Sequence, residues 1–259
     1  MSSWLLALSF FVVAPLQAPG HPVDVSLLIA GPPAVVAEFD LGKLKGEPRQ
    51  LAWAPDLSQL YLQTVEGKPP EEKIHHYVVA VAGGALTSVE RTPDWAIEYW
   101  NIKQDRVAPG IPSLEIQIER TVETIKSGVG QAGVLDRQSS PTGVVSNNPS
   151  PESLANGQHG NSDANVVRLR LLGEEIAVWI NERPVPGAKF GWGPTGTGSL
   201  VYLDEQGSLV LFDRGKHRQT LKGVKDALLP AWSADGARLA YVQRIGKKQI
   251  AIATLPMGR

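Results

Sequence analysis

The chain has 259 residues, of which 42% are hydrophobic and 20% are charged, a composition typical of a soluble globular protein of one or two domains. Its formal net charge of -1 argues against a general binder of nucleic acid or of anionic membranes, since either needs an excess of Lys and Arg. The sequence holds no cysteine, which excludes disulfides, thiol nucleophiles and cysteine-ligated zinc.

The first twenty residues predict an export signal. No charged residue precedes Asp24, and residues 4–16 are almost wholly apolar. This run has the length of the apolar part of a signal peptide and falls short of the roughly 20 residues that cross a bilayer. We expect a signal peptide at 1–20, cleaved after Gly20, and a periplasmic or secreted protein. The alternatives for this segment are an uncleaved membrane anchor, a misassigned start of the chain, or a buried strand. An uncleaved anchor would be the protein's sole contact with a membrane.

Residues 21–125 predict the first part of a β-rich domain. Short apolar runs at 24–29 and 34–39 flank a Gly-Pro-Pro turn and predict two strands. The phrase Leu-Ala-Trp-Ala-Pro-Asp at 51–56 predicts a strand that ends in a tight turn, because Pro presets φ and Asp bonds nearby backbone donors. Further apolar runs up to residue 89 predict the strands that follow.

One helix is predicted, over residues 93–103. Thr92 can cap it, Pro93 suits the first helical position, and Asp94 favours the positive end of the helix dipole. The alternation of apolar and polar residues at 114–119 then predicts a half-buried strand.

Residues 126–165 predict a disordered insertion. Of these forty residues, 21 are Gly, Ser, Asn or Pro, and none is Phe, Trp, Tyr or Ile. Such a segment cannot bury enough apolar area to offset the entropy of ordering it. Order is expected to return in the second part of the domain, 166–259, which begins with a hairpin of two strands at 166–172 and 176–180.

Two further copies of the tryptophan phrase follow. Trp192 and Trp232 lie forty residues apart, and each precedes a short turn and an apolar strand, as Trp53 does. A repeat of this length and order is typical of propeller blades. We therefore predict an all-β, propeller-like fold of about four to six blades, possibly incomplete, with one short helix.

The last copy, residues 230–241, resembles the repeat of the TolB-type propellers of bacterial periplasmic proteins, in which an aromatic and a small residue precede Pro-Asp-Gly. Ala234 stands where that repeat usually has Pro, Leu57 replaces its Gly in the first copy, and the middle copy lacks the Asp. The resemblance covers about 110 residues. It implies that the repeat residues are structural and that the protein binds other proteins or cell-envelope components; similar propellers also occur with peptidases and as sensor or lyase modules.

Few residues suggest a site. His75 and His76 are adjacent on a predicted strand and point to opposite faces, so we expect no metal site and no cofactor. No Gly-x-Ser-x-Gly elbow or phosphate-binding glycine loop occurs, and the adjacent acidic pairs fall in predicted turns. Trp95, Tyr99 and Trp100 either fasten the helix to the propeller or form a docking patch for a partner or a sugar ring.

Three functions follow from these observations. The first is a non-catalytic binding or scaffold protein of the cell envelope that uses the loops of its blades. The second is an enzyme or accessory domain acting on glycans or peptides, which requires acids gathered at the central channel. The third is a structural module that completes its propeller by association, so an oligomer is possible.

Overall fold

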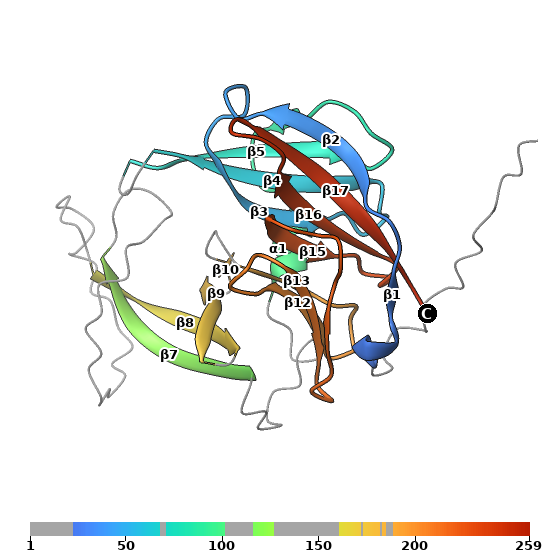
Figure 1. The fold of residues 1–259 in the computed structure, drawn as a ribbon. Coiled ribbons are helices and arrows are strands. Elements are labelled where there is room, and N and C mark those ends of the chain that lie inside the picture. The colour runs from blue at the N-terminus through green and yellow to red at the C-terminus, as the bar shows by residue number, and fades with distance from the viewer. Residues whose placement is uncertain are drawn as a thin grey trace, which may run out of the picture.

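The computed structural model describes residues 23–67, 71–101, 116–126, 161–171, 173–181, 183–184 and 189–259. The strands of these residues form four antiparallel sheets grouped around one α-helix, α1 (Asp94–Trp100) (Figure 1). The fold is mostly β, as predicted, and the four sheets define a β-propeller with four blades, the lower end of the predicted range. The expected signal peptide lies outside the described residues.

Blades 1 and 3 are each a meander of four strands in chain order. Blade 1 consists of β3 (Glu47–Trp53), β4 (Gln59–Glu66), β5 (Lys73–Ala80) and β6 (Thr87–Val89). Blade 3 consists of β11 (Phe190–Trp192), β12 (Ser199–Leu203), β13 (Leu209–Asp213) and β14 (Arg218–Thr220).

Blade 4 is completed by the beginning of the chain. Its consecutive strands are β15 (Ala227–Trp232), β16 (Arg238–Arg244) and β17 (Gln249–Gly258). The outer side of β17 pairs antiparallel with β1 (Ile29–Ala30) and β2 (Ala34–Asp40), with Phe39 opposite Ile250 and Ile29 opposite Gly258. The last blade therefore closes within one chain, and no second molecule has to supply its outer strand.

Blade 2 differs from the others. Its strands are β7 (Ile116–Lys126), β8 (Asn161–Leu171), β9 (Glu174–Ile180) and β10 (Arg183–Pro184). The long β7 and β8 pair over their whole length, with Lys126 opposite Asn161. The predicted insertion, 126–165, therefore overlaps strand residues at both ends, because backbone pairing between β7 and β8 extends into it. Residues 127–160 lie outside the described residues.

The three tryptophans of the repeated phrase occupy equivalent positions. Trp53, Trp192 and Trp232 are the last residues of β3, β11 and β15, and each lies opposite a leucine on the next strand. These three strands are neighbours: β15 lies beside both β3 and β11. The prediction that each phrase belongs to a blade of a propeller is confirmed.

The inner strands approach one another very closely. A Cβ atom added to Gly191 on β11 would lie 2.6 Å from the carbonyl oxygen of Pro230 on β15, so only glycine fits at this position. Because Gly191 lies beside Pro230 and Ala231, the ends of β11 and β15 meet at the same end of the propeller. The turns that follow the three tryptophans are therefore gathered there.

Helix α1 lies near the centre of the molecule, where it contacts β3, β10 and β11 (Figure 1). It begins at Asp94 and ends at Trp100, with Asn101 as C-cap, and is shorter than the predicted 93–103. Pro93 is the N-cap, and no side chain caps the helix, because the Thr92 hydroxyl bonds to Tyr61 instead. No helix in the described part of the chain is both long and apolar enough to span a bilayer.

The predicted strand at 24–29 is mostly a helical turn. Residues Val25–Leu27 form the 3-10 helix η1, because Asp24 accepts a hydrogen bond from the backbone N–H of Ser26 at 2.9 Å. Val25 and Leu28 are buried in a core cluster that the N-terminal segment shares with blades 3 and 4. A second, larger cluster contains side chains from all four blades and from α1.

Candidate functional site

The centre of the described structure is apolar. The rings of Trp100, Trp179, Phe190 and Trp192 contact one another, with centroid separations of 4.8–5.9 Å between neighbours. All four side chains are buried, and Trp179 also donates its indole N–H to the carbonyl oxygen of Trp100. Aromatic packing, and not a set of converging acids, therefore joins blade 2 to α1 and blade 3.

Two of the three predicted docking residues belong to this interior. Tyr99 and Trp100 are 6% and 1% exposed, and the Tyr99 hydroxyl accepts the backbone N–H of Trp232 at 2.8 Å. They fasten the helix to the propeller, which is the first of the two roles expected for them. Trp95 is half-buried, so it alone of the three offers appreciable surface to a partner.

A polar cluster, the Tyr61 cluster, lies beside Trp95 on blade 1. The Tyr61 hydroxyl lies 2.7 Å from Nδ1 of His76 and 3.0 Å from the hydroxyl of Thr92, and Gln63 donates its amide to it at 3.2 Å. The Trp95 ring stands edge-on to Tyr61, with centroids 6.2 Å apart. The cluster links β4 and β5 to the start of α1 and so fixes the position of Trp95.

Burial sets the protonation states in the Tyr61 cluster. Burial raises the pKa of Tyr61 above its ordinary value. The hydrogen bonds with Thr92 and Gln63 lower this pKa, but their effect is smaller than that of burial. Burial also lowers the pKa of His76, and the neighbouring charge of His75 acts in the same direction. Both groups are therefore neutral near pH 7, and the cluster offers uncharged hydrogen-bonding groups.

The two adjacent histidines have different partners, as their alternation on a strand predicted. Nε2 of His75 lies 3.0 Å from Oε2 of Glu66, whereas His76 faces Tyr61. Two of the adjacent acidic pairs contain a residue with a structural partner. Asp204 accepts the backbone N–H groups of its own turn, and Glu174 pairs with Lys189.

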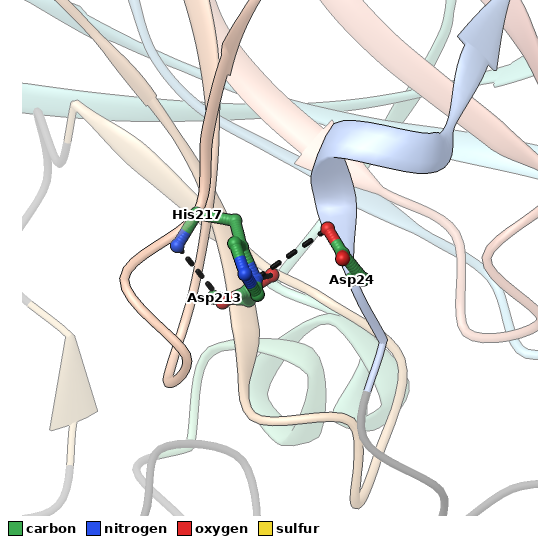
Figure 2. Close-up of side chains that lie close together, drawn as sticks. All are labelled: Asp24, Asp213 and His217. Carbon is green, nitrogen blue, oxygen red and sulfur yellow. Dashed lines mark hydrogen bonds and ion pairs between the residues drawn. The ribbon is translucent and has the colours of Figure 1, made fainter.

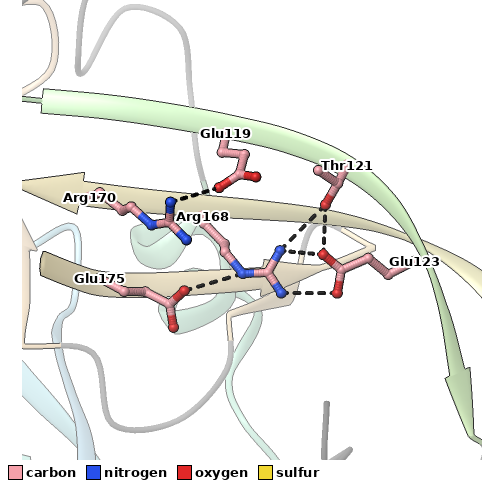
Figure 3. Close-up of polar contacts among 6 residues, drawn as sticks. All are labelled: Glu119, Thr121, Glu123, Arg168, Arg170 and Glu175. Carbon is pink, nitrogen blue, oxygen red and sulfur yellow. Dashed lines mark hydrogen bonds and ion pairs between the residues drawn. The ribbon is translucent and has the colours of Figure 1, made fainter. Parts of the chain in front are cut away.

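An ion-pair network lies on blade 2 (Figure 3). The guanidinium of Arg168 on β8 makes two hydrogen bonds to Glu123 on β7 and an ion pair of 3.2 Å with Glu175 on β9. Its side chain is only 8% exposed, and the hydrogen bonds to Glu123 raise the pKa of Arg168 above its ordinary value. Arg168 therefore joins three strands of a blade whose contact with the other blades is mainly aromatic.

A third cluster joins the beginning of the described chain to blade 3 (Figure 2). Nδ1 of His217 lies 3.0 Å from Oδ2 of Asp213, at the end of β13, and 3.4 Å from Oδ1 of Asp24, just before η1. The buried Asp213 carboxylate also accepts the backbone N–H of Val25 at 2.9 Å. This group was not predicted, because 189 residues separate Asp24 from Asp213 and no local motif marks either one.

Neither a protein-family model nor a curated protein matches this sequence. Among the solved structures that match is Sqt1 from Chaetomium thermophilum, at 14% sequence identity and a TM-score of 0.23. The match covers 81% of this chain and 43% of that one, so this chain spans less than half of its length. A similarity this low carries no argument, and the assignment as a four-bladed propeller rests on the strand pairing within this chain.

Proposed function

We propose that this protein is a non-catalytic binding or scaffold protein of the cell envelope, of the TolB-type propeller class. The main support for this proposal is that buried aromatic side chains fill the centre of the described structure. An enzyme that acts at the centre of this fold needs polar groups that converge there, whereas a scaffold needs rigid strands that hold its turns. A packed centre of this kind favours the scaffold.

The binding surface that we propose is formed by the three turns that follow the tryptophans. These turns expose Asp56, Thr195 and Asp235, and the contacts of the inner strands place them at one end of the propeller. We call this end the turn face.

Two of these turns are held by their own aspartates. Asp56 accepts the backbone N–H and hydroxyl of Ser58, and Asp235 accepts the backbone N–H of Ala237 and the hydroxyl of Ser233. Preorganised turns lose little conformational entropy when a partner binds. Trp95, whose position the Tyr61 cluster fixes, is the aromatic side chain that we propose for contact with the partner.

Site-specific photo-crosslinking in intact cells of the native host tests the binding surface. A photoreactive amino acid at Asp56, Thr195 or Asp235 should capture the same partner. Lys247 provides the matched control: it is exposed in the turn between β16 and β17, and β16 runs away from the turn face. Equal capture at Lys247, or no capture at any of the three positions, would contradict the proposal.

Export is the second part of the proposal and is supported by the composition of residues 1–20. Alkaline phosphatase, which is active only in an oxidising compartment, can be fused after residue 259 of the full chain. We expect activity for the full chain, loss of activity when residues 1–20 are deleted, and a mature protein that begins at His21. Activity that is equal in both fusions would contradict export by this segment.

A further inference from the structure

We propose that Asp24, Asp213 and His217 form a binding site for one divalent transition-metal ion of the zinc class. Each residue offers one ligand atom, and these three atoms lie within 4.8 Å of one another. The residues come from the segment before η1, from β13 and from the turn between β13 and β14 (Figure 2). A metal here would fasten the N-terminal segment to blade 3.

The two distances from His217 to the carboxylates suit a shared ion. Zinc binds imidazole nitrogen and carboxylate oxygen at about 2.0–2.2 Å, which places neighbouring ligand atoms roughly 3.0–3.5 Å apart. Nδ1 of His217 lies 3.0 Å from one carboxylate oxygen and 3.4 Å from the other. The same geometry suits a protonated imidazole between two carboxylates, so a proton and a metal ion compete for these atoms.

The surrounding structure holds the ligands in place. Asp213 is 1% exposed, and its two oxygens accept the backbone N–H groups of Val25 at 2.9 Å and of His217 at 3.2 Å. Asp24 is held by Ser26, whose backbone N–H and hydroxyl both bond to Oδ1. The bonds from Val25 and Ser26 end on the carboxylate oxygens that lie nearest to the His217 imidazole. The bond from the His217 backbone ends on the other oxygen of Asp213 and is the outer hydrogen bond that orients this ligand.

One side of the site is accessible. The side chains of His217 and Asp24 are 47% and 37% exposed, whereas that of Asp213 is 2% exposed. An ion can therefore enter from solvent and complete its coordination with water. Three protein ligands with an open position are a common arrangement for zinc.

The ligand types select the class of ion. Calcium and magnesium prefer oxygen ligands alone, whereas an imidazole together with carboxylates suits zinc and its neighbours in the transition series. Two carboxylates with a neutral imidazole also balance the charge of a divalent ion. We therefore expect zinc to bind more tightly than calcium.

The position of the site puts a bound ion between two parts of the fold. The segment that contains Asp24 continues into β1 and β2, which form the outer side of blade 4. Asp213 and His217 belong to blade 3 and the turn that joins two of its strands. A bound ion would therefore link blade 3 to the segment that closes blade 4.

Calorimetric titration of the purified full chain with zinc chloride, after removal of metal by a chelator, tests this inference near neutral pH. We expect one zinc ion per chain in the micromolar range or tighter, and a higher unfolding temperature with zinc. His217→Ala and Asp24→Asn should each weaken binding at least about tenfold. Both side chains are partly exposed, so these variants should fold even if Asp213→Asn does not.

His75→Ala is the matched control, because His75 lies 3.0 Å from a carboxylate oxygen of Glu66, as His217 does from Asp213. It should bind zinc like the wild type and keep the zinc-dependent rise in unfolding temperature. Absence of zinc uptake by the wild type, or wild-type affinity in both His217→Ala and Asp24→Asn, would overturn the inference. Calcium binding as tight as zinc binding would overturn the assigned class of ion.

Discussion

Trp53 donates its indole N–H to the backbone carbonyl oxygen of Ala231 across 3.0 Å, and this buried bond joins blade 1 to blade 4. Trp232, at the equivalent position of blade 4, instead donates to Gly236 in its own turn at 3.0 Å. Trp192, at the equivalent position of blade 3, stacks on Trp179, and its buried indole nitrogen has no hydrogen-bond partner within the described part of the chain. One repeated residue therefore serves three different contacts.

The first prediction compares two of these tryptophans. Trp53→Phe removes the donor that reaches Ala231 from another blade, whereas Trp192→Phe removes an indole N–H that has no partner among the described residues. Both substitutions delete similar volume from the core. We expect Trp53→Phe to lower the free energy of unfolding in urea by about 1–2 kcal/mol more than Trp192→Phe does. Equal losses would show that the interblade hydrogen bond contributes little.

The second prediction concerns the close approach of the inner strands. Gly191→Ala places a methyl group 2.6 Å from the backbone oxygen of Pro230, which cannot move without shifting β15. We expect a loss of about 1–3 kcal/mol in the free energy of unfolding. Gly258→Ala is the control, because its added Cβ meets nothing within 4 Å. A tolerated Gly191→Ala would mean that blades 3 and 4 can separate locally without cost.

The inner strands could be predicted from sequence because one local phrase encodes each of them. A tryptophan at the end of β3, β11 or β15, followed by a turn residue and an apolar strand, specifies both a strand boundary and a buried side chain. The start of the helix could be predicted because Pro93 and Asp94 are local signals for it. The end of the helix at Trp100 could not be predicted. Local chemistry determines these features.

Contacts between distant residues could not be predicted. The pairing of Lys126 with Asn161 orders residues that their composition assigns to an insertion. Asp24 meets Asp213 and His217 only because the beginning of the chain packs against blades 3 and 4. Neither contact leaves a periodic or motif-like pattern in the sequence.

The third prediction is a dependence of stability on pH that comes from His76. Burial lowers its pKa in the folded protein below the ordinary value of 6.5. As the pH falls through 6.5, His76 binds a proton in the unfolded chain before it does so in the folded protein. The contribution of neutral His76 to the free energy of unfolding is therefore complete above pH 6.5. It is lost as the pH falls from 6.5 to the pKa of His76 in the folded protein. Urea unfolding between about pH 7 and about pH 5 measures this loss.

His76→Gln should reduce this loss, because the amide does not titrate and can still bond to the Tyr61 hydroxyl. His75→Gln, at the neighbouring position paired with Glu66, should retain most of it. If the pH dependence of the His76→Gln variant equals that of the wild type, buried His76 is not its source.

The fourth prediction uses two arginines on the same strand of blade 2. Arg168→Met removes the cation that the partly buried carboxylates of Glu123 and Glu175 share (Figure 3). Because Glu123 and Glu175 are 25% and 40% exposed, solvent screens part of the cost, and we expect a loss of about 1–3 kcal/mol.

Arg170→Met is the matched control, since Arg170 and its partner Glu119 are 34% and 44% exposed and should contribute only about 0–1 kcal/mol. The double variant Arg168→Met with Glu123→Gln should recover part of the loss, because it removes the carboxylate together with the cation that it pairs with. Urea unfolding of Arg168→Met, of Glu123→Gln and of the double variant gives the coupling between Arg168 and Glu123. Additive losses would show that this pair does not hold β7 to β8, and that the backbone ladder and the contact of Trp179 with α1 are sufficient to order blade 2.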